Sequence, residues 1–121
     1  MIVCRTIPIY DSDVYLCTNL AEGKAFIRSK SVTKDEDTNL DDCRGICYTL
    51  NAEGKAHRMM CVFEGGLPII VHESVHMAWM VLKHCGVRVS QTNDEPLAYL
   101  TSWLVQEMLN LTTGAAPRLD H

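Results

Sequence analysis

The first half of the chain alternates between short runs of β-forming residues and turn signals. Ile2–Tyr10 and Val14–Thr18 are rich in β-branched and aromatic residues and are separated by three polar residues, which predicts a hairpin. Ile46–Leu50 and Met59–Phe63 predict two further strands, with a turn signal at Asn51–Gly54 between them. These four segments predict a small antiparallel sheet.

The second half changes to the period of a helix after two consecutive glycines. Nothing breaks a helix from Ile69 to His84, Pro68 suits the first turn, and Gly86 suits a left-handed cap. Because this segment is apolar nearly all round, we expect the helix to be buried.

A second amphipathic helix is predicted to open near Pro96 and to end near Gly114. Its apolar positions recur at helical spacing, at Leu97, Leu100, Leu104, Met108 and Leu111. The chain is therefore expected to form one α+β domain over residues 1–121, with the sheet packed against the two helices.

Composition narrows the functional classes. The net charge is −4 and no run of Lys or Arg stands out, which argues against a nucleic-acid partner. The longest apolar region, Leu67–Leu82, is interrupted by polar residues and is too short to span a bilayer. The first residues lack the pattern of a signal peptide, so a cytoplasmic protein with six reduced cysteines is expected. The polar stretch Ser29–Asp42 predicts a solvated loop or a short exposed helix, and the tail Ala115–His121 is expected to fray.

The chemistry lies in the first helix, in the run His72-Glu73-Ser74-Val75-His76. Residues four apart share one face of a helix, roughly 6 Å apart, so His72 and His76 can each present a ring nitrogen to one metal ion. Glu73 lies about 100° round the axis, where it can reach a metal-bound water without binding the metal. This HExxH spacing is typical of a single catalytic zinc ion with the glutamate as general base.

Two other interpretations of the motif stay open. The spacing can arise by chance on a helix with a His-rich polar face, although buried histidines would need partners. The zinc can also be structural, without catalysis; an open coordination position beside Glu73 favours the catalytic interpretation.

A catalytic zinc site of this kind needs a third protein ligand. Glu95 is the strongest candidate, because it falls 19 residues after His76 in the first turn of the second helix. Asp94 is the alternative ligand. Tyr99 follows Glu95 on the same helical face and is the main candidate for a proton donor or oxyanion stabiliser, with His84 and His57 as further guesses.

In these residues the chain resembles the gluzincins, zinc peptidases whose third ligand is a glutamate on a following helix. His72-Glu73-Ser74-Val75-His76 followed by Asn93-Asp94-Glu95-Pro96-Leu97-Ala98-Tyr99 matches that family in kind, order and spacing. The resemblance covers about 40 residues. It implies His72, His76 and Glu95 as zinc ligands and Glu73 as catalytic base. It also implies that the strand leading into the helix, Met59–Phe63, binds the substrate in extended form.

The chain departs from the family at one position. The aspartate that often follows the third ligand by four residues is Tyr99 here, so Tyr99 or Asp94 would orient the first histidine. The whole chain is also similar to short HExxH proteins of tailed phages that are assigned as peptidases, which would place it in the host cytoplasm. That similarity rests on Ile7–Asp11 and Glu95–Gln106.

The expected function is zinc-dependent hydrolysis of a peptide bond in a peptide or protein substrate, with Glu73 activating the zinc-bound water. One alternative is a non-catalytic protein that is stabilised by zinc and binds a host or partner protein. Another is a hydrolase that acts on a non-peptide amide through the same site. The oligomeric state is not predicted.

Overall fold

A computed structural model describes residues 2–30, 40, 42–52 and 54–113 of the chain. The order of elements is β1 (Ile2–Ile7), β2 (Ser12–Cys17), α1 (Leu20–Lys30), β3 (Gly45–Ala52), β4 (Lys55–Val62), α2 (Gly66–His84) and α3 (Glu95–Thr113). Both predicted helices and both predicted hairpins are present. The predictions for most of the polar stretch and for the tail fall on residues 31–39, 41 and 115–121, which lie outside the described residues.

The sheet has four strands in the order β1-β2-β4-β3. The hairpins β1–β2 and β3–β4 are antiparallel, as expected. However, β2 pairs with β4 in parallel over three positions, from Tyr15 opposite Met59 to Cys17 opposite Cys61. The sheet is therefore mixed, and the prediction of an antiparallel sheet is wrong at its centre. The reason is that α1 carries the chain between the two hairpins, a long-range connection that no local pattern encodes.

Helix α1 itself was missed. Asn19 caps it, since its side-chain oxygen accepts a hydrogen bond from the backbone N–H of Glu22 at 2.9 Å. Only Gly23 and Ile27 of this helix are buried. Gly23 lets the helix approach the sheet closely, because an added Cβ would lie 3.3 Å from Cys17 Sγ. A glycine in the middle of a weakly amphipathic segment is a poor sequence signal for a helix.

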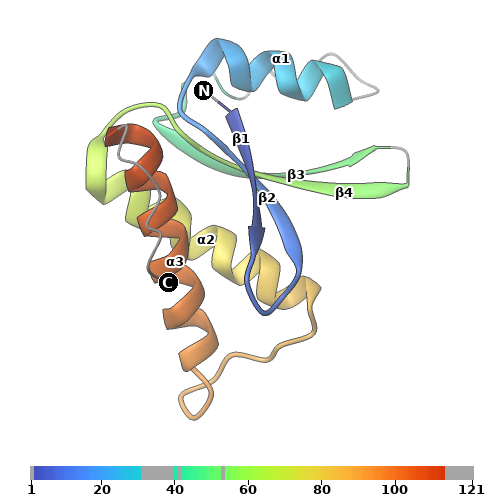
Figure 1. Ribbon diagram of the computed structural model, residues 1–121, viewed down its shortest axis with the longest axis vertical. Helices are drawn as coiled ribbons and strands as arrows, with labels where there is room; N and C mark the ends of the chain where they lie inside the picture. Colours follow the sequence, from blue (N-terminus) through green and yellow to red (C-terminus); the bar gives the residue numbers. More distant parts are fainter. Residues whose placement is uncertain (1, 31–39, 41, 53, 114–121) are drawn as a thin grey trace.

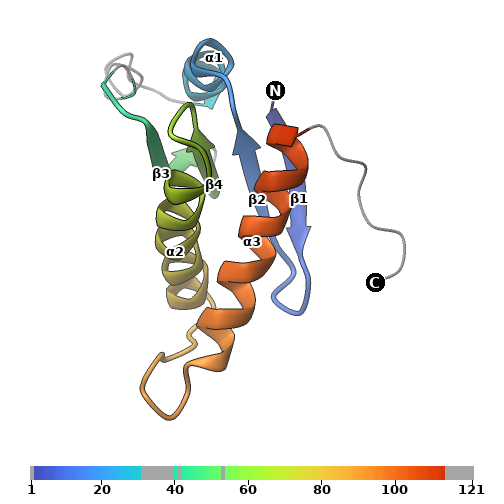
Figure 2. The same cartoon turned by 90° about the vertical axis from the view of Figure 1, so that its left-hand side faces the viewer.

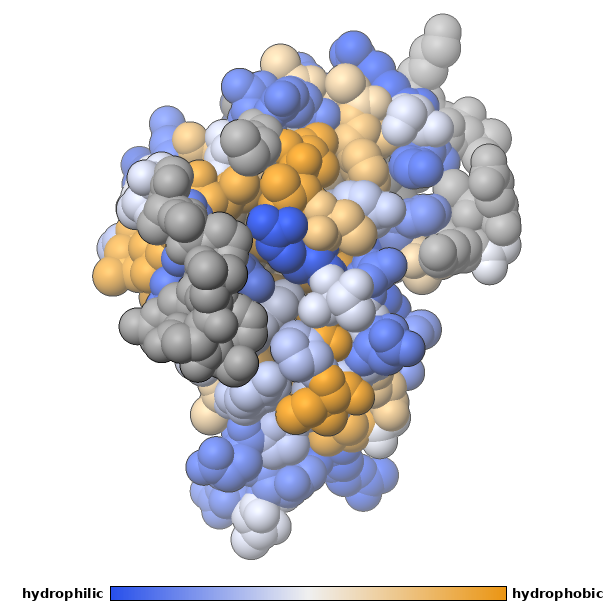
Figure 3. Space-filling model, in the orientation of Figure 1, coloured by the Kyte–Doolittle hydropathy of each residue, from blue (hydrophilic) through white to orange (hydrophobic). Residues whose placement is uncertain are grey.

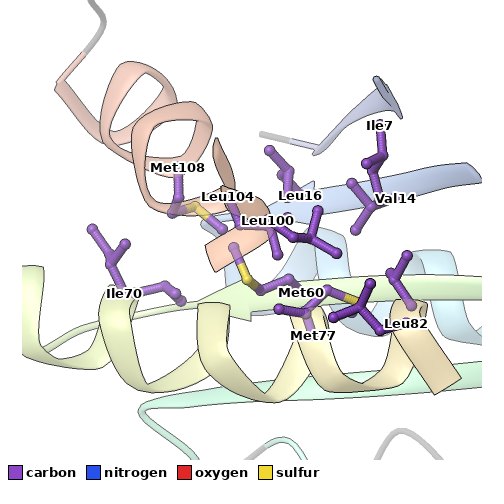
Figure 4. Packing of buried hydrophobic residues seen from close by; sticks show 13 residues of the cluster. Ile7, Val14, Leu16, Met60, Ile70, Met77, Leu82, Leu100, Leu104 and Met108 are labelled. Carbon is purple, nitrogen blue, oxygen red and sulfur yellow. The ribbon is translucent and has the colours of Figure 1, made fainter. Parts of the chain in front are cut away.

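Helices α2 and α3 lie side by side on one face of the sheet (Figures 1 and 2). Their inner faces share one core with the sheet, shown in Figure 4. Its fully buried members include Leu16, Met60, Met77, Leu100 and Leu104. A smaller cluster, with Ile27 of α1 and Met59 of β4, covers the opposite face. Among the described helices, none has the length and apolar character needed to cross a bilayer.

The sheet order also corrects one prediction about substrate binding. Met59–Phe63, which the resemblance nominates as the substrate-binding strand, overlaps β4, and Met59, Met60 and Cys61 are paired on both sides. The backbone groups of β4 are therefore used within the sheet there. The edges of the sheet are β1 and β3.

Candidate functional site

The two histidines of the HExxH run lie together on the outer face of α2. His72 Nε2 and His76 Nε2 are 3.2 Å apart, and the two ring centroids are 4.8 Å apart with the planes inclined at 70°. Two imidazole nitrogens that bind one tetrahedral zinc ion at about 2.0–2.1 Å lie roughly 3.3 Å from each other. The pair therefore fits two ligands of a single ion. Without an ion, the same separation lets one neutral imidazole donate a hydrogen bond to the other.

Glu73 turns the other way, toward the sheet. It is only 7% exposed, and its Oε2 lies 3.9 Å from His72 Nε2. The buried stem places the carboxylate beside the histidine pair. At 3.9 Å it does not occupy the imidazole nitrogen, which stays available to bind a metal. This is the relation that the helical spacing predicts between a zinc pair and a general base.

Strand β3 forms the wall against which Glu73 packs. A Cβ added to Gly45 would lie 2.8 Å from Ile69 Cγ2 and 2.9 Å from Glu73 Cγ, so only glycine permits this approach. Two residues further on, the thiol of Cys47 donates a hydrogen bond to the backbone carbonyl of Glu73 at 2.9 Å. Burial raises the pKa of the Cys47 thiol, and the nearby Glu73 carboxylate raises it further. In this environment the Cys47 thiol is a neutral hydrogen-bond donor.

Gly45 and Cys47 contact the candidate site, and the sequence analysis did not identify either of them. The available signal was the glycine at the start of a predicted strand, which often marks a close approach by a second segment.

The third metal ligand does not appear in this arrangement. Among the residues that the structure describes, no group of three His, Cys, Asp or Glu side chains has a geometry that could hold a metal ion. Glu95 is the exposed first residue of α3, and Tyr99 stands one turn later with 39% of its surface exposed. Asp94 lines a groove between α2 and α3, opposite Val75. Glu95 or Asp94 as third ligand, and Tyr99 as proton donor, stay predictions.

The outer face of α2 corrects a second expectation. The helix is buried only toward the sheet and α3, whereas Leu67, Val71, Val75 and Trp79 are 36% to 52% exposed at successive fourth positions. His72 and His76 are exposed beside this apolar stripe, and 63% of the His72 side-chain surface is accessible. The prediction of a helix buried all round is therefore wrong on this face. The metal-binding interpretation thus loses the support of burial and rests on the geometry of the pair.

The remaining histidine candidates lie apart from this pair. His84, at the end of α2, and His57, on β4, line a separate polar cavity. Arg58, which no sequence argument singled out, lines the same cavity. The signal was present, because Arg58 has the same strand phase as the core residues Met60 and Val62.

We predict that Gly45→Ala lowers the free energy of unfolding by about 1–3 kcal/mol, because the new methyl group overlaps Ile69 and Glu73. Urea denaturation followed by circular dichroism measures the change. Thr49→Ala, at an exposed position of the same strand, is the control and is expected to cost less than about 0.5 kcal/mol. Equal stability of wild type and Gly45→Ala would mean that β3 does not press on Glu73.

The chain was compared with protein-family models, with curated proteins and with solved structures, and none of them matches it. The residues of α2 are thus the basis for a functional proposal.

Proposed function

We propose that the chain is a zinc-dependent hydrolase of peptide bonds with a minimal zincin-like domain. One observation carries the proposal: His72 Nε2 and His76 Nε2 converge to 3.2 Å with the largely buried Glu73 carboxylate 3.9 Å from one of them. Two neutral imidazoles and one adjacent carboxylate are the donor set that this chemistry requires.

His72 and His76 would hold the ion, and Glu95 remains the predicted third ligand. When bound, zinc supplies a Lewis acid that lowers the pKa of a water molecule and polarises a carbonyl group. Glu73 accepts the proton of the attacking water and delivers it to the leaving amine. Its packing against Gly45 fixes the carboxylate in place, so little orientation is lost in the reaction.

The edge strand β3 is the better candidate for holding an extended substrate. It ends the sheet, and its Gly45 lies against the stem of Glu73. A peptide added to the edge of β3 would run past the catalytic carboxylate, with main-chain hydrogen bonds providing affinity. A hydrolase of a non-peptide amide would use the same three residues of α2 but would not need this edge.

The metal site is tested by elemental analysis of the purified protein. We predict near-stoichiometric zinc in the wild type and loss of zinc in His72→Ala and His76→Ala. His84→Ala, on the same helix but lining another cavity, is the matched control and should retain zinc. Glu95→Ala tests the third ligand and is expected to weaken zinc affinity at least about tenfold. A wild-type protein that takes up no zinc after reconstitution would end the metal interpretation.

The catalytic role is tested by Glu73→Gln. We predict that this variant keeps its zinc but hydrolyses a peptide library about 10²–10⁴-fold more slowly, because the amide cannot accept the proton. Glu107→Gln, on α3, is the control for a change of one charge. Full activity in zinc-loaded Glu73→Gln would remove Glu73 from the mechanism.

A non-catalytic role is the second candidate, and the exposed stripe on α2 favours it. From Gly66 to Leu82 the only charged side chain is Glu73, which turns inward, so the outer face carries none. Depletion of charge around exposed apolar residues is typical of the centre of a protein interface. A second copy of the chain is the partner that fits, because two copies related by a two-fold axis would meet without repulsion and would supply four imidazoles to one zinc ion.

The hydrolase and the zinc-bridged pair differ in the number of zinc ions bound per chain. A zinc-bridged pair predicts one zinc ion per two chains and a doubling of mass on addition of zinc, measured by light scattering coupled to gel filtration. Val75→Glu, which charges the stripe without touching the histidines, is predicted to prevent that doubling. A monomer with one zinc ion per chain would exclude the bridged pair and leave the hydrolase.

A further inference from the structure

A polar cavity of about 380 Å³ lies away from the histidine pair, where the two hairpins separate. β2 and β4 are paired only from Tyr15 and Met59 onward, so the preceding residues of the two strands diverge (Figure 1). The cavity sits in this fork and reaches the C-terminal end of α2. Asp11, Asp13, His57, Arg58 and His84 are among its lining residues.

Arg58 is the unusual member of this cavity. The residue is 7% exposed, and among the described residues no fully buried side-chain nitrogen or oxygen lacks a partner, so the guanidinium nitrogens that have no protein partner are open to the cavity. Its phase on β4, shared with Met60 and Val62, turns the side chain toward the face that α2 covers. A guanidinium has five N–H donors in a planar arrangement, and the donors that face the cavity are available to a ligand.

Two aspartates of the β1–β2 turn line the same cavity without pairing to Arg58. Both Asp11 and Asp13 are exposed, which places them at the rim, while Arg58 is buried. Asp13 accepts a hydrogen bond from the hydroxyl of Thr6 at 2.8 Å, which fixes its carboxylate. The cavity thus has the positive charge of the largely buried Arg58 on its inner wall and negative charges at its mouth.

We propose that this fork binds a small zwitterion, an α-amino acid, independently of the zinc site. Its carboxylate accepts two parallel hydrogen bonds from the Arg58 guanidinium, a geometry that suits this planar group. Its ammonium group lies at the rim against Asp11 and Asp13, and the imidazole of His84, at the end of α2, can donate one N–H to the ligand. A cavity of this size suits a small molecule and leaves room for a side chain.

A simple anion fits the cavity less well. Phosphate or acetate would satisfy Arg58 but would meet the two rim carboxylates without offering them a positive charge. A ligand that carries both charges satisfies both sets of side chains. The arrangement therefore favours a zwitterion over an anion alone.

The test is isothermal titration of the full-length protein with a panel of L-amino acids up to about 10 mM. Each hit is compared with its N-acetyl form, which lacks the ammonium group, and its amide, which lacks the carboxylate. His76→Ala is titrated in parallel, because amino acids also bind zinc, and binding through the fork should be unchanged in that variant. Sodium acetate and inorganic phosphate are the anion probes.

Binding of a free amino acid at least about tenfold tighter than either blocked form is the expected result. Arg58→Met should abolish it, and Arg58→Lys should weaken it, because an ammonium cannot form the bidentate pair. Arg88→Met, at an exposed arginine, is the matched control and should bind as the wild type does. Asp11→Asn should remove the preference for the free amino group; Asn tolerates the left-handed backbone of Asp11, whose φ is 49°.

Equal binding of acetate or phosphate would overturn the zwitterion, and absence of any binding would overturn the site. Either result leaves the zinc proposal untouched, since no arm of this experiment depends on His72 or Glu73.

Discussion

The packing of α2 onto the sheet is the contact on which both candidate sites depend. Ile70, Met77 and Val81 lie on the buried face of α2 and belong to the same core cluster as Met60 of β4, and the burial of this face fixes the rotation of the helix about its axis. Figure 4 shows Ile70, Met77 and Met60 in this cluster. With that rotation set, helical geometry turns Glu73 toward β3 and His72 toward solvent. A helix rotated by one residue, about 100°, would turn His72 toward β3 and move Glu73 to the fully buried position of Ser74. The burial of a few apolar side chains thus determines which groups of the HExxH run can bind a metal and which can act as a base.

The parallel pairing of β2 with β4 is the second constraint. It holds two twisted hairpins together over three positions only, and the hairpins then diverge. The space-filling view in Figure 3 shows apolar patches separated by hydrophilic surface on the face that carries the β1–β2 hairpin. At the tip of that hairpin, Ile9 and Asp11 both have positive φ, and Ile9 is 81% exposed. A β-branched residue rarely adopts this conformation, so the turn that holds Asp11 at the fork is strained.

Local signals in the sequence predicted the parts of the fold that local physics determines. The strand runs, Pro68 at the start of α2 and Gly86 at its end have the predicted roles, and Gly86 has a φ of 75°. The parallel contact between β2 and β4 could not be predicted, because it depends on α1, whose interrupted pattern around Gly23 is a weak signal. The exposure of Val75 and Trp79 was also missed. An apolar residue in a helix can be buried, but whether it is buried depends on which segments pack against it.

The candidate site also has a part that local sequence signals predict and a part that depends on tertiary contacts. The spacing of His72, Glu73 and His76 predicted their mutual geometry, because the relative positions of three residues on one helix need no tertiary information. The packing of Gly45 against Glu73 could not be predicted, because it depends on which strand lies against the helix. Glu73 and Arg58 are the two charged side chains that the described core buries, and each is on an inward-facing position of an otherwise apolar segment. Among the described residues no fully buried side-chain nitrogen or oxygen lacks a partner, so the stems of these side chains are buried while any charged atom without a partner is open to solvent. The Glu73 carboxylate lies beside His72 and the Arg58 guanidinium lines a polar cavity, so each charged group is placed where a ligand can bind.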